Sequence, residues 1–562
     1  MKRLPNTRAV RSAMLAAGLL AGLGSMASAQ TGAVISARPG QRTLKPVPEA
    51  GTEGMRLSLD EAVALAVANN QDLNVSVNAA EASNFQLLST WGIFDPLAEA
   101  SIIRSHSEEP ATSQLVGADV STRDNTDISA QITQLAPTGG TFSLGFAANR
   151  TSTNSTFFFI NPSYFGGLTF SFNQPLLRNF GRDTTTWLIR TARNSRDASY
   201  QNFVRSVQGT VNGVEQAYWD LVYALRNLEV QREARVLSSD LNRITRIKID
   251  VGSLAPIDIV QTEVGIATAE QQIIIAEGLI GDAQDRLKRL LNLDPAKWNV
   301  PIVPTDEVRV DQPAVSVEDG MRQALSRRPE IIAAAYSVDS DRIRYDYWRN
   351  QTKPALDLVG SYGNAGIGGR TTIRDEQGNV ISRSDGGFGD AFEQVIDRDF
   401  KNWSIGLRFS YPILSRRAKG LRGAALYTWE ANKAGLTALE QNVLVEVRAA
   451  ARDIDTASRS IAAAEKAREL AERNLDAERK KFENGMTTSF QVLEITNDLS
   501  LARVNELQAL AIYRKALSAY HYAIADILDW KSIRIEDLPP AEPPRDGSRS
   551  PQPLAAPPPA VP

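Results

Sequence analysis

Residues 207–228, VQGTVNGVEQAYWDLVYALRNL, lie in the middle of a stretch without proline that runs from Gly181 to Gly252. A single α-helix over this stretch would be about 105 Å long at ~1.5 Å per residue, which is deeper than an ordinary globular core. Apolar residues recur along it at alternating steps of four and three, namely Val207, Val211, Val214, Tyr218, Leu221, Leu225 and Leu228. This pattern is the seam of a coiled coil, so we expect a long helix over 181–250 with a partner beside it.

A second stretch without proline runs from Lys419 to Gly485 and predicts a second long helix over 419–483. Its apolar residues keep the same rhythm: Val443, Val447, Ala450, Ile454, Ala457, Ile461 and Ala464. Two long helices of similar length indicate an internal duplication.

The duplication extends beyond the long helices. Leu57-Ser58-Leu59-Asp60-Glu61-Ala62 places a serine N-cap before an acidic first turn and predicts a helix to about Trp91. Val315-Ser316-Val317-Glu318-Asp319-Gly320 repeats this pattern. We therefore predict a first repeat over 56–293, a linker over 294–314 and a second repeat over 315–530.

The N-terminal residues predict export. Four basic residues, Lys2, Arg3, Arg8 and Arg11, precede an apolar run over 14–21, and Ala27-Ser28-Ala29 has the form of a cleavage site. We predict a signal peptide over 1–29; the alternative is an amphipathic N-terminal helix that the protein keeps. Residues 30–55 are rich in Gly, Pro, Thr and Ala and predict a flexible segment, and the Pro-rich tail over 531–562 is expected to be disordered.

Composition excludes several classes of function. A net charge of -3 offers no basic field for nucleic acid. The absence of Cys removes disulfides, thiolate chemistry and a lipidated N-terminal cysteine. With only His106 and His521, we expect no catalytic residues, no metal site and no cofactor. After the signal peptide no apolar run reaches about 18 residues, so a membrane span would have to be made of strands.

Strands are predicted over 97–174 and 355–411, where the apolar period changes from 3.6 to 2. Leu168, Phe170 and Phe172 alternate with small polar residues, as do Ile405, Leu407, Phe409 and Tyr411. Such strands are typical of a transmembrane barrel, with lipid outside and water inside. The alternative is a half-buried sheet in a soluble protein. Polar stretches rich in glycine or small residues predict exposed loops over 107–126, 150–164 and 363–400.

The first repeat contains an additional hairpin near 127–149. Two alternating segments flank Pro137-Thr138-Gly139-Gly140, a turn signal, and the second repeat has no equivalent. Four strands, or six with this hairpin, are too few to close a transmembrane barrel. Because an open sheet edge cannot lie in lipid, several chains would have to share one barrel.

Each long helix is followed by a reversal at Gly252 or Gly485 and then by a shorter return helix, over 256–293 and 488–528. We expect the first return helix to stack end to end with the helix over 318–350 and so line one long helix. Pro329 is expected to kink or break that helix.

The order of these elements resembles the TolC family of outer-membrane efflux proteins over residues 56–530. The resemblance rests on the two repeats, on Gln174-Pro175-Leu176-Leu177-Arg178, and on the Val251-Gly252 turn followed by Asp258 and Gln261. It implies an α+β membrane protein in the outer membrane with a periplasmic extension. Its internally duplicated coiled-coil helices would form a trimeric α-barrel, joined to a shared β-barrel of usually twelve strands. The additional hairpin would either raise the strand number to eighteen or lengthen the strands outside the membrane, and we expect the latter.

The resemblance also implies partners and functional residues. The partners would be two further copies of the chain, a periplasmic adaptor (membrane fusion protein), an inner-membrane transporter and lipid. The tips that dock the adaptor would be Gly252, Ser253, Leu254, Ala255, Gly485, Met486 and Thr487, and the gate candidates are Asp258, Phe482, Gln491 and Glu494. Gln491 replaces an acid of the family and Thr487 replaces a frequent arginine, so a closing network of charge pairs would be weaker here. The alternative is that Asp258 and Glu494 are ordinary solvated residues.

The function implied is a passive exit duct of a tripartite efflux or type I secretion system, opened at its tip by the adaptor and pump. A secreted coiled-coil scaffold without a membrane barrel is the alternative. A trimeric diffusion porin would not need two helices of ~100 Å. The sequence does not identify the cargo.

Overall fold

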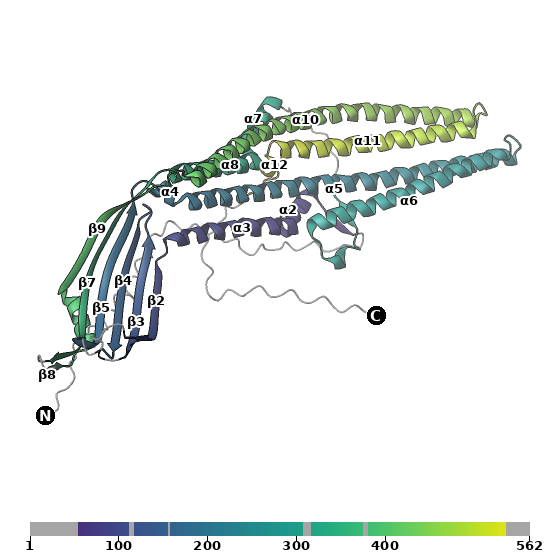
Figure 1. Ribbon diagram of the computed structural model, residues 1–562. Coiled ribbons are helices and arrows are strands. Elements are labelled where there is room, and N and C mark those ends of the chain that lie inside the picture. The colour runs from purple at the N-terminus through teal and green to yellow at the C-terminus, as the bar shows by residue number, and fades with distance from the viewer. Residues whose placement is uncertain are drawn as a thin grey trace, which may run out of the picture.

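The computed structural model describes residues 54–111, 117, 119–155, 158–306, 316–374 and 380–535. The predicted signal peptide over 1–29 lies outside these residues. So do all but the last two residues of segment 30–55 and all but the first five of the tail 531–562. The molecule is elongated, with a sheet at one end and long helices that extend away from it (Figure 1).

Two first helices, a long helix and a return helix occur in each half of the chain, together with a few short helices that are not repeated. The first half contains α2 (Leu59–Asn69), α3 (Gln71–Trp91), α4 (Arg182–Thr185), α5 (Trp187–Asp250) and α6 (Ile257–Leu291). The second half contains α7 (Val317–Arg327), α8 (Pro329–Gln351), α9 (Phe388–Asp397), α10 (Arg416–Glu483), α11 (Ser489–Ala523) and α12 (Ile527–Trp530).

The two long helices are α5, with 64 residues, and α10, with 68 residues. Their predicted seams are largely buried: Val211, Val214, Tyr218 and Leu221 of α5 and Val447 of α10 are 0% exposed. The seams pack against the return helices α6 and α11 and against the first helices of each repeat. This burial of apolar area supplies most of the stability of the two helices, because helix propensity alone contributes little.

The predicted stacking of residues 256–293 on residues 318–350 is wrong. The return helix α6 instead meets α2, so that α3, α2 and α6 follow one another along α5 (Figure 1). Likewise α7 and α8 lie along α10, as does α11. The reason is topological: each return helix runs back toward the first helix of its own repeat.

The first helix of each repeat is broken at equivalent positions. Pro329 is the first residue of α8, in agreement with the predicted break. The single helix expected from Ser58 to Trp91 is interrupted at Asn70, whose backbone is extended with ψ of 131°. The Asn70 side chain accepts a hydrogen bond from Leu73 N at 3.1 Å and so caps α3. This capping explains why one predicted helix is two.

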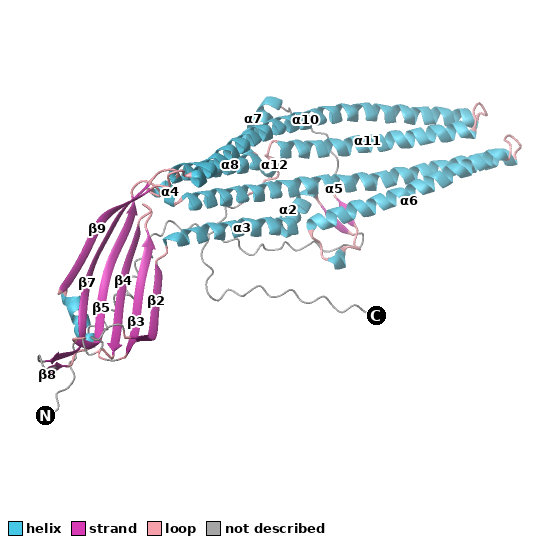
Figure 2. Ribbon diagram, viewed as in Figure 1, coloured by secondary structure: helices cyan, strands magenta, loops and turns pink. Residues whose placement is uncertain are grey.

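The strands of the main sheet are antiparallel, in the order β2 (Leu97–Pro110), β3 (Val120–Leu135), β4 (Thr141–Thr153), β5 (Ile160–Pro175), β7 (Ala355–Arg374). On the other side of β7 lie β9 (Phe400–Ser410) and, at the far end, the short β8 (Val380–Ser384). Figure 2 shows this sheet in magenta, with one end joined to the helices; we refer to the other end as the far end.

The additional hairpin forms two full strands of this sheet. β3 and β4 lie between β2 and β5, and β3 is paired with β2 from Leu97 to Pro110. Our expectation that the hairpin would only lengthen other strands is therefore wrong. The alternation of apolar residues on both sides of Pro137 predicts the strands themselves, but not their place between β2 and β5.

Most of the predicted loop over 363–400 is also regular structure. β7 continues to Arg374, and residues 388–397 form α9. The glycines that favoured a loop lie where a strand packs closely against a helix. A Cβ at Gly366 would lie 2.0 Å from Ala391 O, and one at Gly368 would lie 2.2 Å from Gly387 O.

The two faces of the sheet differ in chemistry. We call one the apolar face; it carries Phe142, Leu144, Leu168, Phe170, Ile405 and Leu407, and these side chains are between 39% and 68% exposed. We call the other the hydroxyl face; the register places Thr133, Ser143, Ser171, Ser361 and Ser404 in one row across it. Two neighbouring pairs of hydroxyls in this row are hydrogen-bonded, Ser143–Ser171 at 2.6 Å and Ser361–Ser404 at 2.8 Å.

The described part of the predicted linker is tied to the helices. It contains η3 (Pro295–Lys297) and β6 (Ile302–Pro304), and β6 pairs in parallel with β1 (Met55–Leu57). Tyr218 of α5 donates a hydrogen bond to Asp306 Oδ2 at 2.6 Å and accepts one from Thr305 N at 3.2 Å. These hydrogen bonds therefore attach this segment to the middle of α5.

Candidate functional site at the two helix reversals

The two reversals at the helix tips have the same backbone geometry. Gly252 has φ of +78° and donates to Ile249 O, while Ser253 donates to Lys248 O. Gly485 has φ of +74° and donates to Phe482 O, while Met486 donates to Lys481 O. Both are Schellman turns, in which a left-handed glycine ends the helix and satisfies its last carbonyls. The repeated motif places both tips at the end of the molecule opposite the sheet (Figure 1).

Gly252→Ala is expected to destabilise the first tip by about 1 kcal/mol, because the left-handed backbone strains any residue with a Cβ. A Cβ at Gly252 meets no atom within 4 Å, so the cost is one of backbone conformation alone. Urea unfolding of the detergent-solubilised protein measures it. Gly209→Ala inside α5 is the matched control and should be stabilising; equal losses for the two variants would contradict the argument.

Three predicted gate residues lie near the starts of the return helices. Asp258 is in the first turn of α6, where its Oδ2 accepts from Ala255 N at 3.2 Å. Gln491 is half-buried in the first turn of α11, and its backbone N–H donates to Thr488 Oγ1 at 3.3 Å. Glu494 is exposed on α11. These positions stay candidates for a constriction between copies of the chain.

The fourth, Phe482, lies in the apolar core of the tip. It is 2% exposed and packs with Leu241 of α5, Leu475 of α10, and Val492, Ile495 and Leu499 of α11. The Lys248 ammonium lies 4.9 Å from the centre of its ring. Phe482 therefore holds the two halves of the tip together instead of projecting into a channel.

Charged contacts that the sequence did not reveal join α5 to the second repeat. Arg479 donates to Asp240 at 2.7 Å, and Arg503 donates to Glu233 and, at 3.0 Å, to Glu472. Lys248 Nζ donates to the carbonyls of Phe482, at 2.6 Å, and Glu483, at 3.0 Å. We call these three sets the cross-repeat contacts. Since the partners are more than 230 positions apart along the chain in all but the Arg503–Glu472 pair, no local spacing could have identified them.

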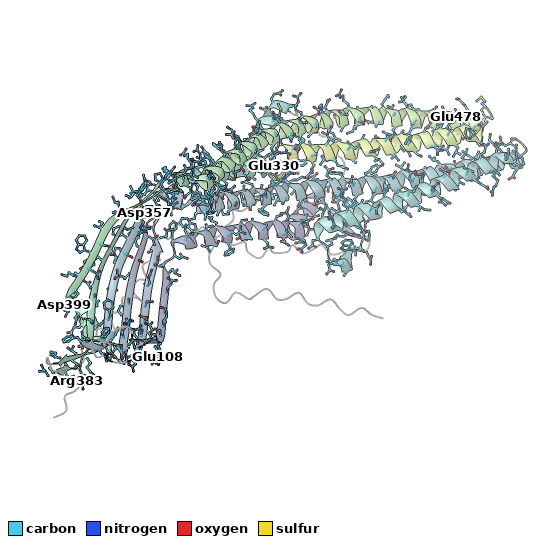
Figure 3. The ribbon with its side chains drawn as sticks, in the orientation of Figure 1. Glu108, Glu330, Asp357, Arg383, Asp399 and Glu478 are labelled. Atoms are coloured by element: carbon cyan, nitrogen blue, oxygen red, sulfur yellow. The ribbon has the colours of Figure 1, made fainter. Side chains whose placement is uncertain are left out.

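Glu478 links the last turns of α10 to the reversal that follows. Its side chain is 8% exposed; its carboxylate accepts from Thr487 Oγ1 at 2.6 Å and from Lys481 Nζ at 3.0 Å. Figure 3 shows Glu478 close to the tip. The hydrogen bond from Thr487, with that from Lys481, holds the pKa of Glu478 below its ordinary value of 4.5. Thr487, which we took as a weakened position, thus has a structural partner.

The second tip is expected to loosen in acid. Because the folded state lowers the pKa of Glu478, its stabilising contribution is present above the ordinary value of 4.5 and is lost as pH falls below it. A spin label at Met486→Cys, a position 69% exposed, should become more mobile in that range. Glu478→Gln should flatten this pH dependence. An unchanged acid transition in that variant would assign the effect to another group.

The described residues contain no candidate metal site and no candidate membrane-spanning helix. Within them, no group of three or more His, Asp or Glu side chains is arranged to hold a metal ion. None of the helices that the structure describes is both long and apolar enough to cross a membrane.

Comparison with known proteins agrees with this architecture. The family model for outer membrane efflux proteins matches residues 137–293 and 320–520. Outer membrane protein TolC of Vibrio cholerae is 21% identical over 336 residues, which cover 60% of this chain and 71% of that protein. The outer-membrane channel OprN has a similar fold, with a TM-score of 0.62 at 14% identity, covering 83% of this chain and 89% of OprN. The Campylobacter jejuni outer membrane channel CmeC aligns with a TM-score of 0.60 at 16% identity, covering 89% of this chain and 93% of CmeC.

Duplicated long helices with matched tips, joined to an antiparallel sheet, make up the fold that this chain shares with the outer-membrane channels OprN and CmeC. The chain belongs to the outer membrane efflux protein family, since the family model matches more than half of it. The predicted resemblance to the TolC family is confirmed. The protein is an efflux duct component of the outer membrane, and its helices extend into the periplasm. OprN and CmeC are outer-membrane channels.

Proposed function

We propose that three copies of this chain share one transmembrane β-barrel and one α-helical barrel, which form the passive exit duct of a tripartite efflux system. The observation that carries the proposal is the sheet itself. It has an exposed apolar face, and it ends in two edge strands, β2 and β9. In lipid such edges must be paired, because their backbone groups have no water to bond. Pairing β9 of one copy with β2 of the next closes the sheet around a three-fold axis.

The barrel proposed here has eighteen strands rather than the twelve first expected. Each copy supplies six long strands, β2, β3, β4, β5, β7 and β9. Barrel diameter grows roughly in proportion to strand number, so this barrel would be about 1.5 times as wide as one of twelve strands. The apolar face would contact lipid, and the hydroxyl face would line a wide polar lumen.

The tips are proposed to dock a periplasmic adaptor and, through it, an inner-membrane transporter that supplies the energy. Val251 and Met486, beside the two turn glycines, are 70% and 69% exposed apolar residues and offer contact area for such a partner. The cross-repeat contacts would hold the tip closed until the adaptor binds. Efflux is favoured over type I secretion by the family, and the transporter recovered by crosslinking at Met486→Cys would decide between them.

Disulfide crosslinking between edge strands tests the shared barrel. The chain has no Cys, so any disulfide that forms must join introduced cysteines. Positions on the hydroxyl face of β9 (Asn402, Ser404, Gly406) are combined with Glu99 or Ser101 of β2. At least one combination should give covalent trimers in membranes, because paired strands bring Cα atoms within disulfide reach.

The control pair is Ser361→Cys with Ser404→Cys, neighbours within one sheet, which should crosslink inside a single chain. If this control forms its disulfide and no β2–β9 combination joins two chains, the shared barrel is wrong. Extraction of the protein from cells without detergent would favour the scaffold alternative.

A further inference from the structure

The short helix α9 lies on the apolar face of the sheet, near its far end. It packs against β7 and β5, with Ala391 and Val395 only 0% and 5% exposed. Phe392 meets Phe146 of β4 edge to face at a centroid distance of 6.1 Å. Phe146 pairs with Leu168 and belongs to the apolar face. The helix therefore sits on the side of the sheet that faces lipid under the proposed function, on which this inference rests.

Two glycines on that face, Gly366 and Gly368, make room for the helix. A Cβ at Gly366 or Gly368 would collide with the backbone of residues 387–391, and one at Gly166 would lie 3.7 Å from Val395. The same contacts show that the N-terminus of α9 lies by Gly368 and that the helix runs along β7 toward Gly366. In Figure 3, Asp399 just after α9 lies between Asp357, at the helix end of the sheet, and Arg383, at the far end.

The helix also satisfies the edge of β7 where β9 no longer covers it. β9 pairs with β7 only from Ala355 to Ala365. Just beyond, the Gln394 side chain accepts from Ile367 N and donates to Ile367 O, each at 3.0 Å. Gln394 thus faces the seam with a neighbouring copy, whereas Phe392 faces β4 on the opposite side.

One edge of α9 stays apolar and uncovered. Phe388 is 37% exposed and Ile396 is 52% exposed, and they flank Phe392 at spacings of four residues, which places all three on one edge of the helix. Glu393 and Asp397 lie on the polar side and are exposed. Since the apolar edge is on the β4 side, away from the seam, a second copy of the chain does not cover it.

The level of α9 on the sheet fits the outer boundary of a bilayer. The apolar residues of β9 from Phe409 to Trp403 span about 20 Å along the strand. Their last row pairs Trp403 with Tyr362, and aromatic residues of this kind mark the interface of membrane barrels. Gly366, which lies against the middle of α9, is four residues beyond Tyr362, so the middle of the helix lies just beyond this aromatic row.

We propose that α9 is an interfacial helix, whose apolar edge of Phe388, Phe392 and Ile396 contacts lipid of the outer leaflet while Glu393 and Asp397 face water. Amphipathic helices at membrane interfaces place their apolar side chains in the acyl boundary, and α9 would do so with one edge while its axis follows β7. The helix would anchor the far end of the barrel at a fixed depth and shield the open stretch of β7.

Fluorescence quenching in proteoliposomes tests the proposal. Full-length protein carries a single environment-sensitive fluorophore at Ile396→Cys, with Phe388→Cys as a second position and Glu393→Cys on the polar side as the matched control. Leu407→Cys reports the middle of the apolar band. Nitroxide lipids labelled near the headgroup should quench the Ile396 probe at least about twofold more than the Glu393 probe, and iodide in the water should show the reverse order.

The outcomes separate the two proposals. If the Leu407 probe is quenched by lipid but the Ile396 and Phe388 probes are quenched only by iodide, α9 lies outside the membrane and the inference is overturned. If the α9 probes escape both lipid and iodide, another protein surface covers them, which also overturns it. If the Leu407 probe itself escapes lipid, the sheet is not in the membrane and the proposed function fails.

Discussion

Glu215→Ala is expected to lower the free energy of unfolding by about 3–5 kcal/mol, the usual cost of removing one partner from a buried ion pair. Glu215 of α5 is 0% exposed, and its Oε1 lies 2.6 Å from Lys531 Nζ, whose side chain is 10% exposed. The variant leaves the Lys531 ammonium buried without its main counter-charge. It should also loosen the segment after α11, because Lys531 and the neighbouring α12 lie against α5. Urea unfolding followed by circular dichroism measures the loss.

Two controls identify the cause. Glu229→Ala removes an ion pair of the same helix, with Arg226, in which both side chains are more than half exposed, so its cost should stay below about 1 kcal/mol. Replacing Glu215 and Lys531 together by Met should recover most of the stability, because two apolar side chains need no charge compensation. If the double variant is as unstable as Glu215→Ala, packing rather than charge explains the effect.

Removing two cross-repeat contacts, with Arg479→Ala and Arg503→Ala together, is expected to raise the time-averaged conductance of single channels in planar bilayers, because each channel would spend more time open. Arg479 of α10 pairs with Asp240 of α5, and Arg503 of α11 pairs with Glu233 of α5. Arg503 also pairs with Glu472 of α10, and the two arginine side chains are 32% and 26% exposed. Partly exposed pairs contribute about 1 kcal/mol each, so losing both shifts a closed–open equilibrium by about 2 kcal/mol. That corresponds to about thirtyfold in the ratio of the two states.

Arg459→Ala is the matched control. Arg459 pairs with Asp455 within α10, and both side chains are largely exposed, so its removal should leave conductance unchanged. Reverting either alanine to arginine restores one contact and should raise the fraction of closed channels part of the way back. If the double variant conducts like the natural protein, these contacts do not hold the tip.

The sequence predicts the long helices and their tips, but it predicts few of the tertiary contacts between them. The four-three rhythm from Val207 to Leu228 predicts α5 because a heptad seam is a property of neighbouring turns. Gly252 and Gly485 predict the tips because only a residue without a Cβ ends a helix easily in the left-handed region. Both signals come from residues that are close together in the sequence, so a single sequence is enough to detect them.

The features that the sequence missed depend on distant partners. In the sequence, Asp240 and Arg479 cannot be distinguished from ordinary solvated helix residues. Only the folded structure shows that they form an ion pair. The break at Asn70 depends on its side chain, which caps α3 where the sequence predicts a continuous helix. Gly366 and Gly368 read as loop residues, because nothing near them in the sequence reveals that α9 packs on them. The place of β3 and β4 in the sheet likewise depends on β2 and β5.

An electron cryo-microscopy map of the detergent-extracted particle tests the central claim most directly. The account predicts a three-fold particle with one eighteen-stranded barrel, in which β9 of each copy pairs with β2 of the next, and a helical duct beyond it. A particle in which each chain keeps its own separate sheet, or in which the shared barrel has twelve strands because β3 and β4 leave the wall, would contradict it.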